Sequence, residues 1–326
     1  MPKLRVAVIG LGNIARKHVE VLKALPACKV VAGVKRDRAT GQTFCEEFQI
    51  PQFFTSTADL LQWGEFDAAV VSVGHIHTIE VAKSVLKTGR PCLIEKPVGF
   101  SAKEAASVAK VAKQAGTWGM VGVNRRFYSN IRKALELAHK AGGLQALVVQ
   151  HAEWIHQSAG WGLSAEVLDR YFFVNGVHLI DLMCHAAGMP EQVCALARTG
   201  PERRNSYDAL FAFPGNVPGH YVSQWYAPGR WTIDFFARDL RIRFHSLENA
   251  TVQRTGGEET PLPLDAVDQR YKAGFYRQMK VFIGAVIAHQ EPAPPACLLD
   301  EAVAVMKVIE AVNQPKVGLR CRRQKS

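Results

Sequence analysis

The first fifteen residues constrain the fold of this 326-residue chain more than any other segment. An aliphatic run, Leu4–Ile9, ends at a glycine, and a helical pattern of apolar residues begins at Asn13. Between them lies Gly10-Leu11-Gly12-Asn13-Ile14-Ala15, with the spacing G-x-G-x-x-A. The first glycine permits a tight turn, the second lets a backbone approach a pyrophosphate, and the small third residue lets helix and strand pack closely. The segment therefore predicts a dinucleotide site formed by Gly10, Gly12, Asn13 and Ile14.

The rest of the first third repeats this alternation of strand and helix. Four more apolar runs occupy residues 29–34, 68–73, 91–94 and 118–123. Helical stretches are expected over residues 13–25, 44–48, 78–86 and 102–114. Strands that alternate with helices form a parallel sheet covered on both faces. We therefore expect an α/β fold with a parallel sheet in residues 1–123.

The pattern changes after residue 123. A helix is expected over 131–140, and period-two segments follow at 144–155, 209–213, 220–226 and 232–245, separated by Pro-Gly turns. Such segments are typical of an antiparallel sheet with hairpins. Two helices, 276–289 and 300–313, follow. The sequence thus predicts a second domain over 124–314, built on an open, mainly antiparallel sheet, and a basic tail over 315–326.

Composition restricts the class of protein. Hydrophobic residues make up 48% and charged residues 21%, which excludes a largely disordered chain. No apolar run reaches the roughly 18–20 residues of a membrane span. The seven cysteines are scattered, with no C-x-x-C pair, and no secretory signal is visible, so we expect a cytoplasmic protein. The net charge of +11 is compatible with nucleic acid, a membrane surface or phosphorylated small molecules.

Cofactor choice depends on the end of the second strand, about 20 residues beyond the fingerprint. This chain has Lys35-Arg36-Asp37-Arg38 there. Cations favour the 2′-phosphate of NADP, whereas a carboxylate would repel it. We expect NADP, bound by Lys35 and Arg36. NAD is the alternative, in which Asp37 accepts the ribose hydroxyls after a small shift in register.

Glu95-Lys96-Pro97 follows the fourth strand, at the carboxyl edge where open α/β sheets bind ligands. A lysine partly desolvated beside a cofactor can have its pKa lowered into a range useful for proton transfer. As an isolated tripeptide, it is more often a strand terminator in which Lys96 pairs with Glu95.

Further motifs follow in a fixed order along the chain. They are a run ending at Ser72-Val73 with His77 beyond, Glu95-Lys96-Pro97, Asn124-Arg125-Arg126-Phe127 and Gly176-Val177-His178-Leu179-Ile180-Asp181. With the fingerprint, this set resembles the glucose-fructose oxidoreductase / inositol dehydrogenase / MocA (Gfo/Idh/MocA) family. The resemblance implies an N-terminal Rossmann domain, a C-terminal α/β domain, and NAD(P)-dependent oxidation or reduction of sugars, cyclitols and related substrates. It also implies a homodimer or homotetramer that buries the open sheet face.

The same resemblance assigns roles to individual residues. Lys96 matches the family's catalytic lysine, between the nicotinamide and the substrate hydroxyl. His178 matches a histidine often assigned as general acid/base, and Asp181 matches the aspartate that follows it. The resemblance and motif positions place Ser72, Val73, His77, Glu95 and Lys96 with the cofactor, and Arg125, Arg126 and Asn175 with the substrate.

One position departs from the family pattern. The inositol-dehydrogenase type has an aspartate four residues before the histidine, and this chain has Val174. A histidine without its carboxylate is a weaker base, although Asn175, Asp169 or Asp181 could substitute. The alternative function is therefore a cofactor-binding sensor or regulatory protein with weakened turnover.

Other features support no further chemistry. Nucleic-acid binding rests on charge alone and is not expected. No metal site is expected, because His151, His156, His185 and His220 lack ligand spacing. For Trp154, Trp161, Trp225 and Trp231 we expect mainly packing roles.

Overall fold

The computed structural model describes residues 2–155, 160 and 162–314. The basic tail, His156 and Trp161 lie outside the described residues. Contacts divide the chain into two compact units. Of the described residues, unit one comprises those up to Arg132 and Leu264–Ala304, and unit two comprises those within Lys133–Pro263 and 305–314. The domain boundary at residue 123 remains a prediction, but by contacts the segment after Pro263 returns to unit one.

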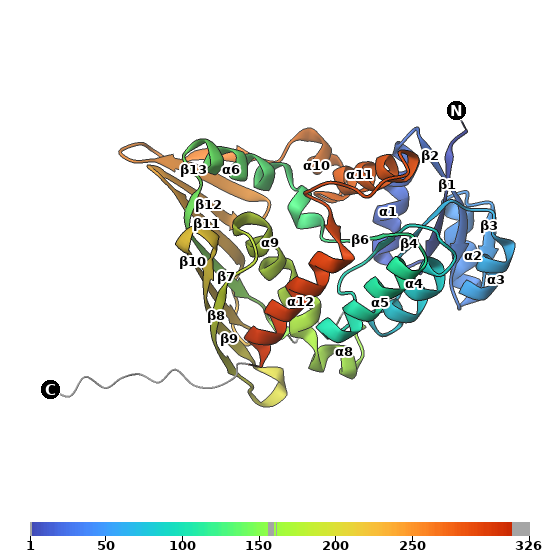
Figure 1. Cartoon of the computed structure of the whole chain (residues 1–326), viewed down its shortest axis with the longest axis horizontal. Helices are drawn as coiled ribbons and strands as arrows, with labels where there is room; N and C mark the ends of the chain where they lie inside the picture. The colour runs from blue at the N-terminus through green and yellow to red at the C-terminus, as the bar shows by residue number, and fades with distance from the viewer. Residues whose placement is uncertain (1, 156–159, 161, 315–326) are drawn as a thin grey trace. The chain divides into compact units, whose positions relative to one another are not determined.

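Unit one contains a seven-stranded sheet in the order β15-β6-β5-β4-β1-β2-β3. Figure 1 labels β6, β4, β1, β2 and β3 of this sheet. All neighbouring strands are parallel except β15, which pairs antiparallel with β6. This confirms the predicted Rossmann sheet. The strands are β1 (Leu4–Ile9), β2 (Cys28–Val34), β3 (Gln52–Phe54), β4 (Ala68–Val71), β5 (Cys92–Ile94), β6 (Gly119–Val121) and β15 (Cys297–Leu298).

Helices connect these strands. The central strands are apolar throughout because both faces are buried; every residue of β4, for example, is fully buried. The helices and short turns are α1 (Asn13–Ala24), α2 (Arg38–Glu47), α3 (Thr57–Trp63), η1 (His75–His77), α4 (Thr78–Leu86), α5 (Ala102–Gln114), η2 (Asn124–Phe127), α10 (Ala266–Arg270) and α11 (Phe275–Ile287).

The late segment that returns to unit one is part of its core. Phe275, Met279 and Phe282 of α11 belong to the same buried cluster as Val6 of β1 and Val19 of α1. The α12 helix (Leu299–Asn313) follows β15.

Unit two contains an eight-stranded sheet, here called the open sheet, in the order β14-β13-β12-β11-β7-β10-β9-β8. Only β7 and β10 pair in parallel, so the prediction of a mainly antiparallel sheet is confirmed. The predicted segment 232–245 is two strands, because the chain turns at Asp239, where φ is 54°. The strands are β7 (Leu144–Ala152), β8 (Gln192–Arg198), β9 (Ser206–Phe213), β10 (Val217–Gln224), β11 (Trp231–Ala237), β12 (Leu240–Ser246), β13 (Asn249–Arg254) and β14 (Thr260–Pro263).

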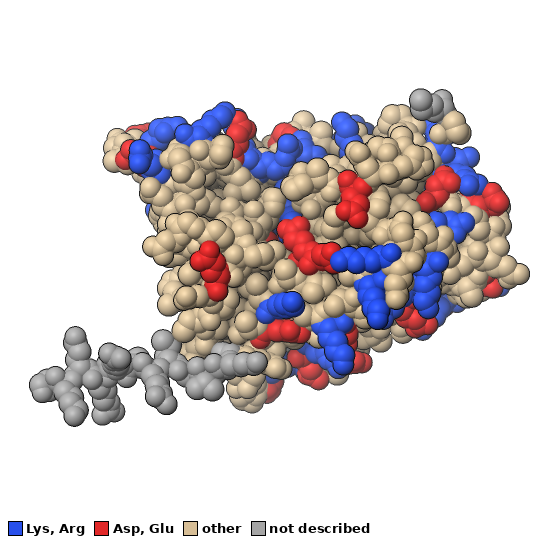
Figure 2. All heavy atoms as spheres, viewed as in Figure 1, with Lys and Arg blue, Asp and Glu red and all other residues tan. Residues whose placement is uncertain are grey.

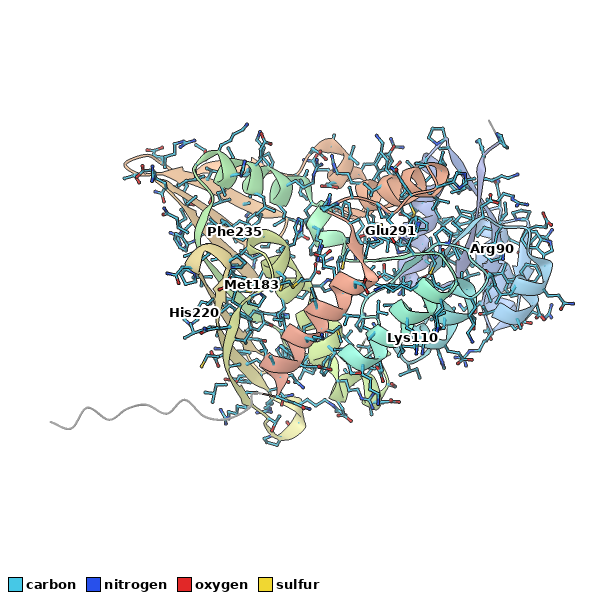
Figure 3. The ribbon with its side chains drawn as sticks, in the orientation of Figure 1. Arg90, Lys110, Met183, His220, Phe235 and Glu291 are labelled. Carbon is cyan, nitrogen blue, oxygen red and sulfur yellow. The ribbon has the colours of Figure 1, made fainter. Side chains whose placement is uncertain are left out.

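The two faces of the open sheet differ. One face is buried and packs against α9; a Cβ on Gly219 of β10 would lie 3.2 Å from Met183 of that helix, labelled in Figure 3. The other, here called the open face, exposes Val148, Leu196, Leu210 and His220. Helices of unit two are α6 (Ser129–Lys140, which begins in unit one), α8 (Ala165–Asp169) and α9 (Val177–Ala187), the last preceded by a π-helical turn at Phe172–Gly176.

No helix in the described part of the chain is long and apolar enough to cross a membrane. On the face shown in Figure 2, Lys and Arg side chains are interspersed with Asp and Glu. Lys113 of α5 and Asp300 of α12, for example, form an ion pair of 2.7 Å.

Candidate functional site

The glycine turn after β1 has the geometry that the fingerprint requires. Gly10 has a φ of 91°, and a Cβ there would lie 2.6 Å from the carbonyl oxygen of Ser72. The Ser72 hydroxyl donates to the Gly10 carbonyl at 2.9 Å, which ties this turn to the end of β4. Gly12 is the N-cap of α1, and a Cβ there would meet nothing within 4 Å. The turn therefore leaves open space over a helix N-terminus, as a pyrophosphate needs.

Two adjoining residues complete the start of α1. Asn13 is its first residue, and Ile14 is 36% exposed. The first turn carries no acidic residue that would repel a phosphate.

The end of β2 separates its cations from its carboxylate. Asp37 is the N-cap of α2, where its side chain accepts hydrogen bonds from the backbone N–H of Thr40 at 2.8 Å and from the Thr40 hydroxyl. These bonds lower the pKa of Asp37. Arg36 extends toward η1, with its Nη2 3.1 Å from Nε2 of His77, and Lys35 precedes it. Oδ1 of Asp37 thus caps α2, and Lys35 and Arg36 are the two positive charges directly before it.

Glu95, which follows β5, lies in a buried hydrogen-bond network. Oε1 of Glu95 is 2.7 Å from Nε2 of His18 in α1, and these side chains are 15% and 1% exposed. Burial opposes ionisation of Glu95, but the His18 hydrogen bond and the charges of His18, Lys96 and Lys272 outweigh it and lower its pKa. The His18 ring packs against Phe275 of α11, with centroids 4.8 Å apart. A side chain of α1, held by packing against α11, therefore positions the residue before Lys96.

Lys96 also affects a histidine that sequence reasoning missed. His75, the first residue of η1, has its pKa lowered to about 4 by burial and by the positive charge of Lys96. His75 is therefore neutral at pH 7. In unit one the carboxyl ends of β1, β2, β4 and β5 together place the glycine turn, the cations, Ser72, Val73, His77 and Lys96 at one edge of the sheet.

The two arginines after β6 differ in environment. Arg125 donates to Oδ1 of Asn124 at 2.8 Å and lies over the Tyr128 ring. Arg126 is 1% exposed and pairs with Glu301 at 2.8 Å. The geometry of Arg126 is that of a structural ion pair, whereas Arg125 keeps partial exposure.

A second set of polar groups lies in unit two. His178 and Asp181 are on α9, three residues apart, and are 6% and 1% exposed. The His178 ring is 5.6 Å from that of Trp231, the first residue of β11. Asn175, on the preceding π-helical turn, donates to Oε2 of Glu153 at 2.7 Å. Asn175 is thus bonded to a carboxylate that sequence reasoning missed.

Glu153 follows β7 and is the centre of this cluster. Its Oε2 also accepts from Nε1 of Trp231 at 2.9 Å and lies 3.6 Å from Nε2 of His151. Burial opposes ionisation of Glu153, yet its pKa is lowered because His151, Trp231 and Asn175 stabilise the carboxylate. Burial lowers the pKa of His151. No motif marks Glu153; only its place after an alternating strand could have drawn attention to it.

A cavity of about 1600 Å³ lies at the other edge of the parallel sheet and is not a candidate site. It is lined by residues near the amino ends of β1, β4 and β5, and by Arg90 and Glu291, labelled in Figure 3. Arg90 donates to the carbonyls of Phe66 and Gly64, and Arg5 pairs with Asp67. These arginines are committed to holding the fold.

Comparisons with known proteins agree with this geometry. Residues 4–124 match the sequence model of an oxidoreductase family with an NAD-binding Rossmann fold, and residues 128–246 match the GFO/IDH/MocA C-terminal domain. The chain is 26% identical over 233 residues to trans-1,2-dihydrobenzene-1,2-diol dehydrogenase of Mus musculus, covering 67% of this chain and 68% of that protein.

Solved structures share the whole fold. An aldose-aldose oxidoreductase from Caulobacter crescentus matches with a TM-score of 0.82 at 19% identity, covering 95% of this chain and 96% of that one. A putative NADPH-dependent oxidoreductase from Desulfitobacterium hafniense matches with a TM-score of 0.82 at 16% identity, covering 96% and 95%. With the matched sequence models, these likenesses lead to one conclusion: the chain belongs to the Gfo/Idh/MocA family of NAD-binding oxidoreductases.

Proposed function

We propose that this protein is an NADP-preferring dehydrogenase or reductase that transfers hydride between a nicotinamide and a carbinol or carbonyl carbon of a sugar, cyclitol or related small molecule. The observation that carries the proposal is the carboxyl edge of the parallel sheet in unit one. That edge combines an open glycine turn at a helix N-terminus with Lys96 after β5. The Gly10–Ile14 turn would hold the pyrophosphate, and Ser72, Val73, His77 and Glu95 would line the rest of the cofactor site.

The preference for NADP rests on the end of β2. Lys35 and Arg36 supply positive charge for a 2′-phosphate, while Oδ1 of Asp37 caps α2. Thermal unfolding with NADP or NAD at matched concentrations tests the preference, because a ligand of the native state adds RT ln(1 + [L]/Kd) to stability. A larger stabilisation by NAD would reverse the assignment.

A bound nicotinamide would supply the hydride chemistry. Lys96 would exchange the proton of the substrate hydroxyl, and we assign His178 and Asp181 to the same reaction by family resemblance. Arg125 and Asn175 are proposed as substrate contacts; Arg126 is a weaker candidate because of its pairing with Glu301. General acid–base catalysis of this kind contributes roughly 10²–10⁴-fold.

Replacing Lys96 with alanine tests this role. We expect kcat, measured at saturating NADP, to fall by roughly 10²–10⁴-fold. Lys110→Ala is the matched control, because Lys110 is exposed on α5 (Figure 3). Turnover by the Lys96 variant at the rate of the control would remove the mechanism.

The alternative, a sensor with weakened turnover, is favoured by Val174, which is buried where a carboxylate would support His178. Single-turnover oxidation of bound NADPH across a panel of sugars and ketones distinguishes the two functions. Oxidation of NADPH supports the enzyme, and binding without oxidation supports the sensor.

We also propose a homodimer or homotetramer formed through the open face. Leu196 and Leu210 are 61% and 53% exposed on this face, and Val148 is 39% exposed. Exposed apolar residues grouped on one sheet face are typical of an interface. Sedimentation velocity tests the assembly. The cytoplasmic location expected from the cysteines remains a prediction.

A further inference from the structure

The Glu153 carboxylate in unit two carries a charge that no cation balances among the described residues. Its partners among the described residues are all neutral or weakly basic: the Asn175 amide, the Trp231 indole, the Tyr171 hydroxyl and the His151 ring. The Glu153 side chain is only 14% exposed. Burying a carboxylate without a paired cation costs free energy, and carboxylates kept in such places are often found at functional sites.

The two oxygens of this carboxylate are used unequally. Oε2 accepts two short hydrogen bonds, from Asn175 at 2.7 Å and from Trp231 at 2.9 Å. Oε1 accepts one long bond of 3.4 Å, from Tyr171. A carboxylate oxygen has two lone pairs, so Oε1 retains capacity for a strong donor. The short bonds at Oε2 fix the group, and Oε1 is the atom left for a ligand.

A second polar atom beside the carboxylate is unsatisfied. Nε2 of His151 is buried and has no hydrogen-bond partner among the described residues, while Nδ1 is 2.8 Å from the hydroxyl of Tyr221. The 3.6 Å between Nε2 and Oε2 of Glu153 is longer than a hydrogen bond. Closed structural networks satisfy their buried polar atoms. A fixed carboxylate beside an unsatisfied buried ring nitrogen is therefore the arrangement we expect of a binding site.

Aromatic rings surround the carboxylate. The Trp231 ring lies 4.6 Å from the His151 ring and 5.6 Å from the His178 ring, and Trp231 is partly exposed. An indole face provides a flat apolar surface for the C–H face of a ring, while a neighbouring carboxylate accepts its hydroxyl hydrogens. His178, assigned to the reaction above, borders the same indole.

We propose that Glu153 is the specificity-determining carboxylate of the substrate site: Oε1 accepts a hydroxyl of a neutral hydroxylated ring lying against Trp231, and the negative charge excludes anionic substrates. This inference rests on the proposed function and adds its substrate class, neutral polyols and ring diols in preference to sugar acids and sugar phosphates.

The test measures binding and turnover separately on the full chain. Calorimetric titrations without cofactor would use myo-inositol, D-glucose and trans-1,2-cyclohexanediol as neutral rings, and D-glucuronate and D-glucose 6-phosphate as anions. Glu153→Gln, which removes the charge at nearly constant shape, should weaken binding of at least one neutral ring by roughly 10- to 100-fold. The variant should also show a smaller ratio of affinity for the neutral rings to affinity for the anions. Glu258→Gln, in the exposed turn between β13 and β14, is the matched control and should bind like the wild type.

Glu153→Asp keeps the charge but retracts the oxygens, so it should weaken neutral binding and still exclude anions. This variant decides the question if Glu153→Gln does not fold by circular dichroism. Equal binding by wild type and Glu153→Gln, or wild-type binding of anions as strong as of neutral rings, overturns the inference, as does the absence of binding to every neutral ring. Glu153-dependent binding without NADP-dependent oxidation supports this inference and instead contradicts the proposed function.

Discussion

The His18–Glu95 pair allows a quantitative test of how the fold supports the segment before Lys96. His18→Leu keeps an apolar group of similar size against Phe275 but removes the donor 2.7 Å from Oε1 of Glu95. Breaking a fully buried ion pair by removing one partner costs about 3–5 kcal/mol. Glu95 is 15% exposed and keeps the charges of Lys96 and Lys272, so we expect a smaller loss, about 2–3 kcal/mol. At about 2–4 °C per kcal/mol, Tm should fall by roughly 4–12 °C.

The loss should depend on pH in a predictable direction. In the wild type the pKa of Glu95 is lowered, so its contribution is complete above the unfolded value of about 4.3 and is lost as pH falls through the folded value. Without His18, the effect of burial on Glu95 is offset less, so the pKa of Glu95 in the folded variant is raised. The difference in free energy of unfolding between wild type and variant is then largest at pH 7. It becomes smaller as pH falls through the raised pKa of Glu95.

Urea unfolding at pH 7, 6 and 5, followed by circular dichroism, measures both effects. His18→Gln is the control, because its amide can still donate to Glu95 and should recover much of the stability. Equal midpoints for wild type and His18→Leu at pH 7, or a deficit that is the same at every pH, would refute this reasoning.

Three further outcomes are expected. Gly10→Ala should lower unfolding stability by roughly 1–3 kcal/mol, because its methyl group meets Ser72; Gly12→Ala should unfold like the wild type in urea but bind NADP more weakly, and equal behaviour of the two variants would argue against the glycine turn as described. Arg36→Ala should weaken NADP binding by roughly tenfold and spare NAD in calorimetric titrations, whereas equal losses would exclude a 2′-phosphate contact. Leu210→Glu should shift sedimentation toward the monomer, and an unchanged coefficient would place the interface elsewhere.

The parts of the fold that could be predicted from sequence are those with local signals. Leu4–Ile9, Thr78–Leu86 and Ala102–Gln114 have the predicted bounds because glycines, prolines or a change of period mark their ends. Gln52–Phe54 was not predicted because three residues show no period. The β8 strand, Gln192–Arg198, alternates in exposure, but its alanines and cysteine make the hydrophobic contrast weak.

The candidate site divides in the same way. The glycine turn is readable because its function depends on consecutive backbone positions. Glu153 could not be identified in this way, because its proposed role depends on contacts with Asn175, Trp231 and Tyr171, which lie 18 to 78 residues away in sequence. The role of Asp37 as a helix cap was also open at the level of sequence, because capping and ribose binding use the same residue type at nearly the same position.

The return of α11 and β15 to unit one determines the order in which a newly made chain can complete its parts. The strand β6 gains its outer partner only when Cys297 and Leu298 are present. The buried cluster of β1 and α1 is complete only when Phe275 and its neighbours are present. On the ribosome, every strand of the open sheet is synthesised before these residues emerge. The nucleotide-binding unit, although it begins at the N-terminus, is therefore completed only after the strands of unit two have been made. A truncated chain that ends near residue 123 would retain the fingerprint but lack part of the core beneath it.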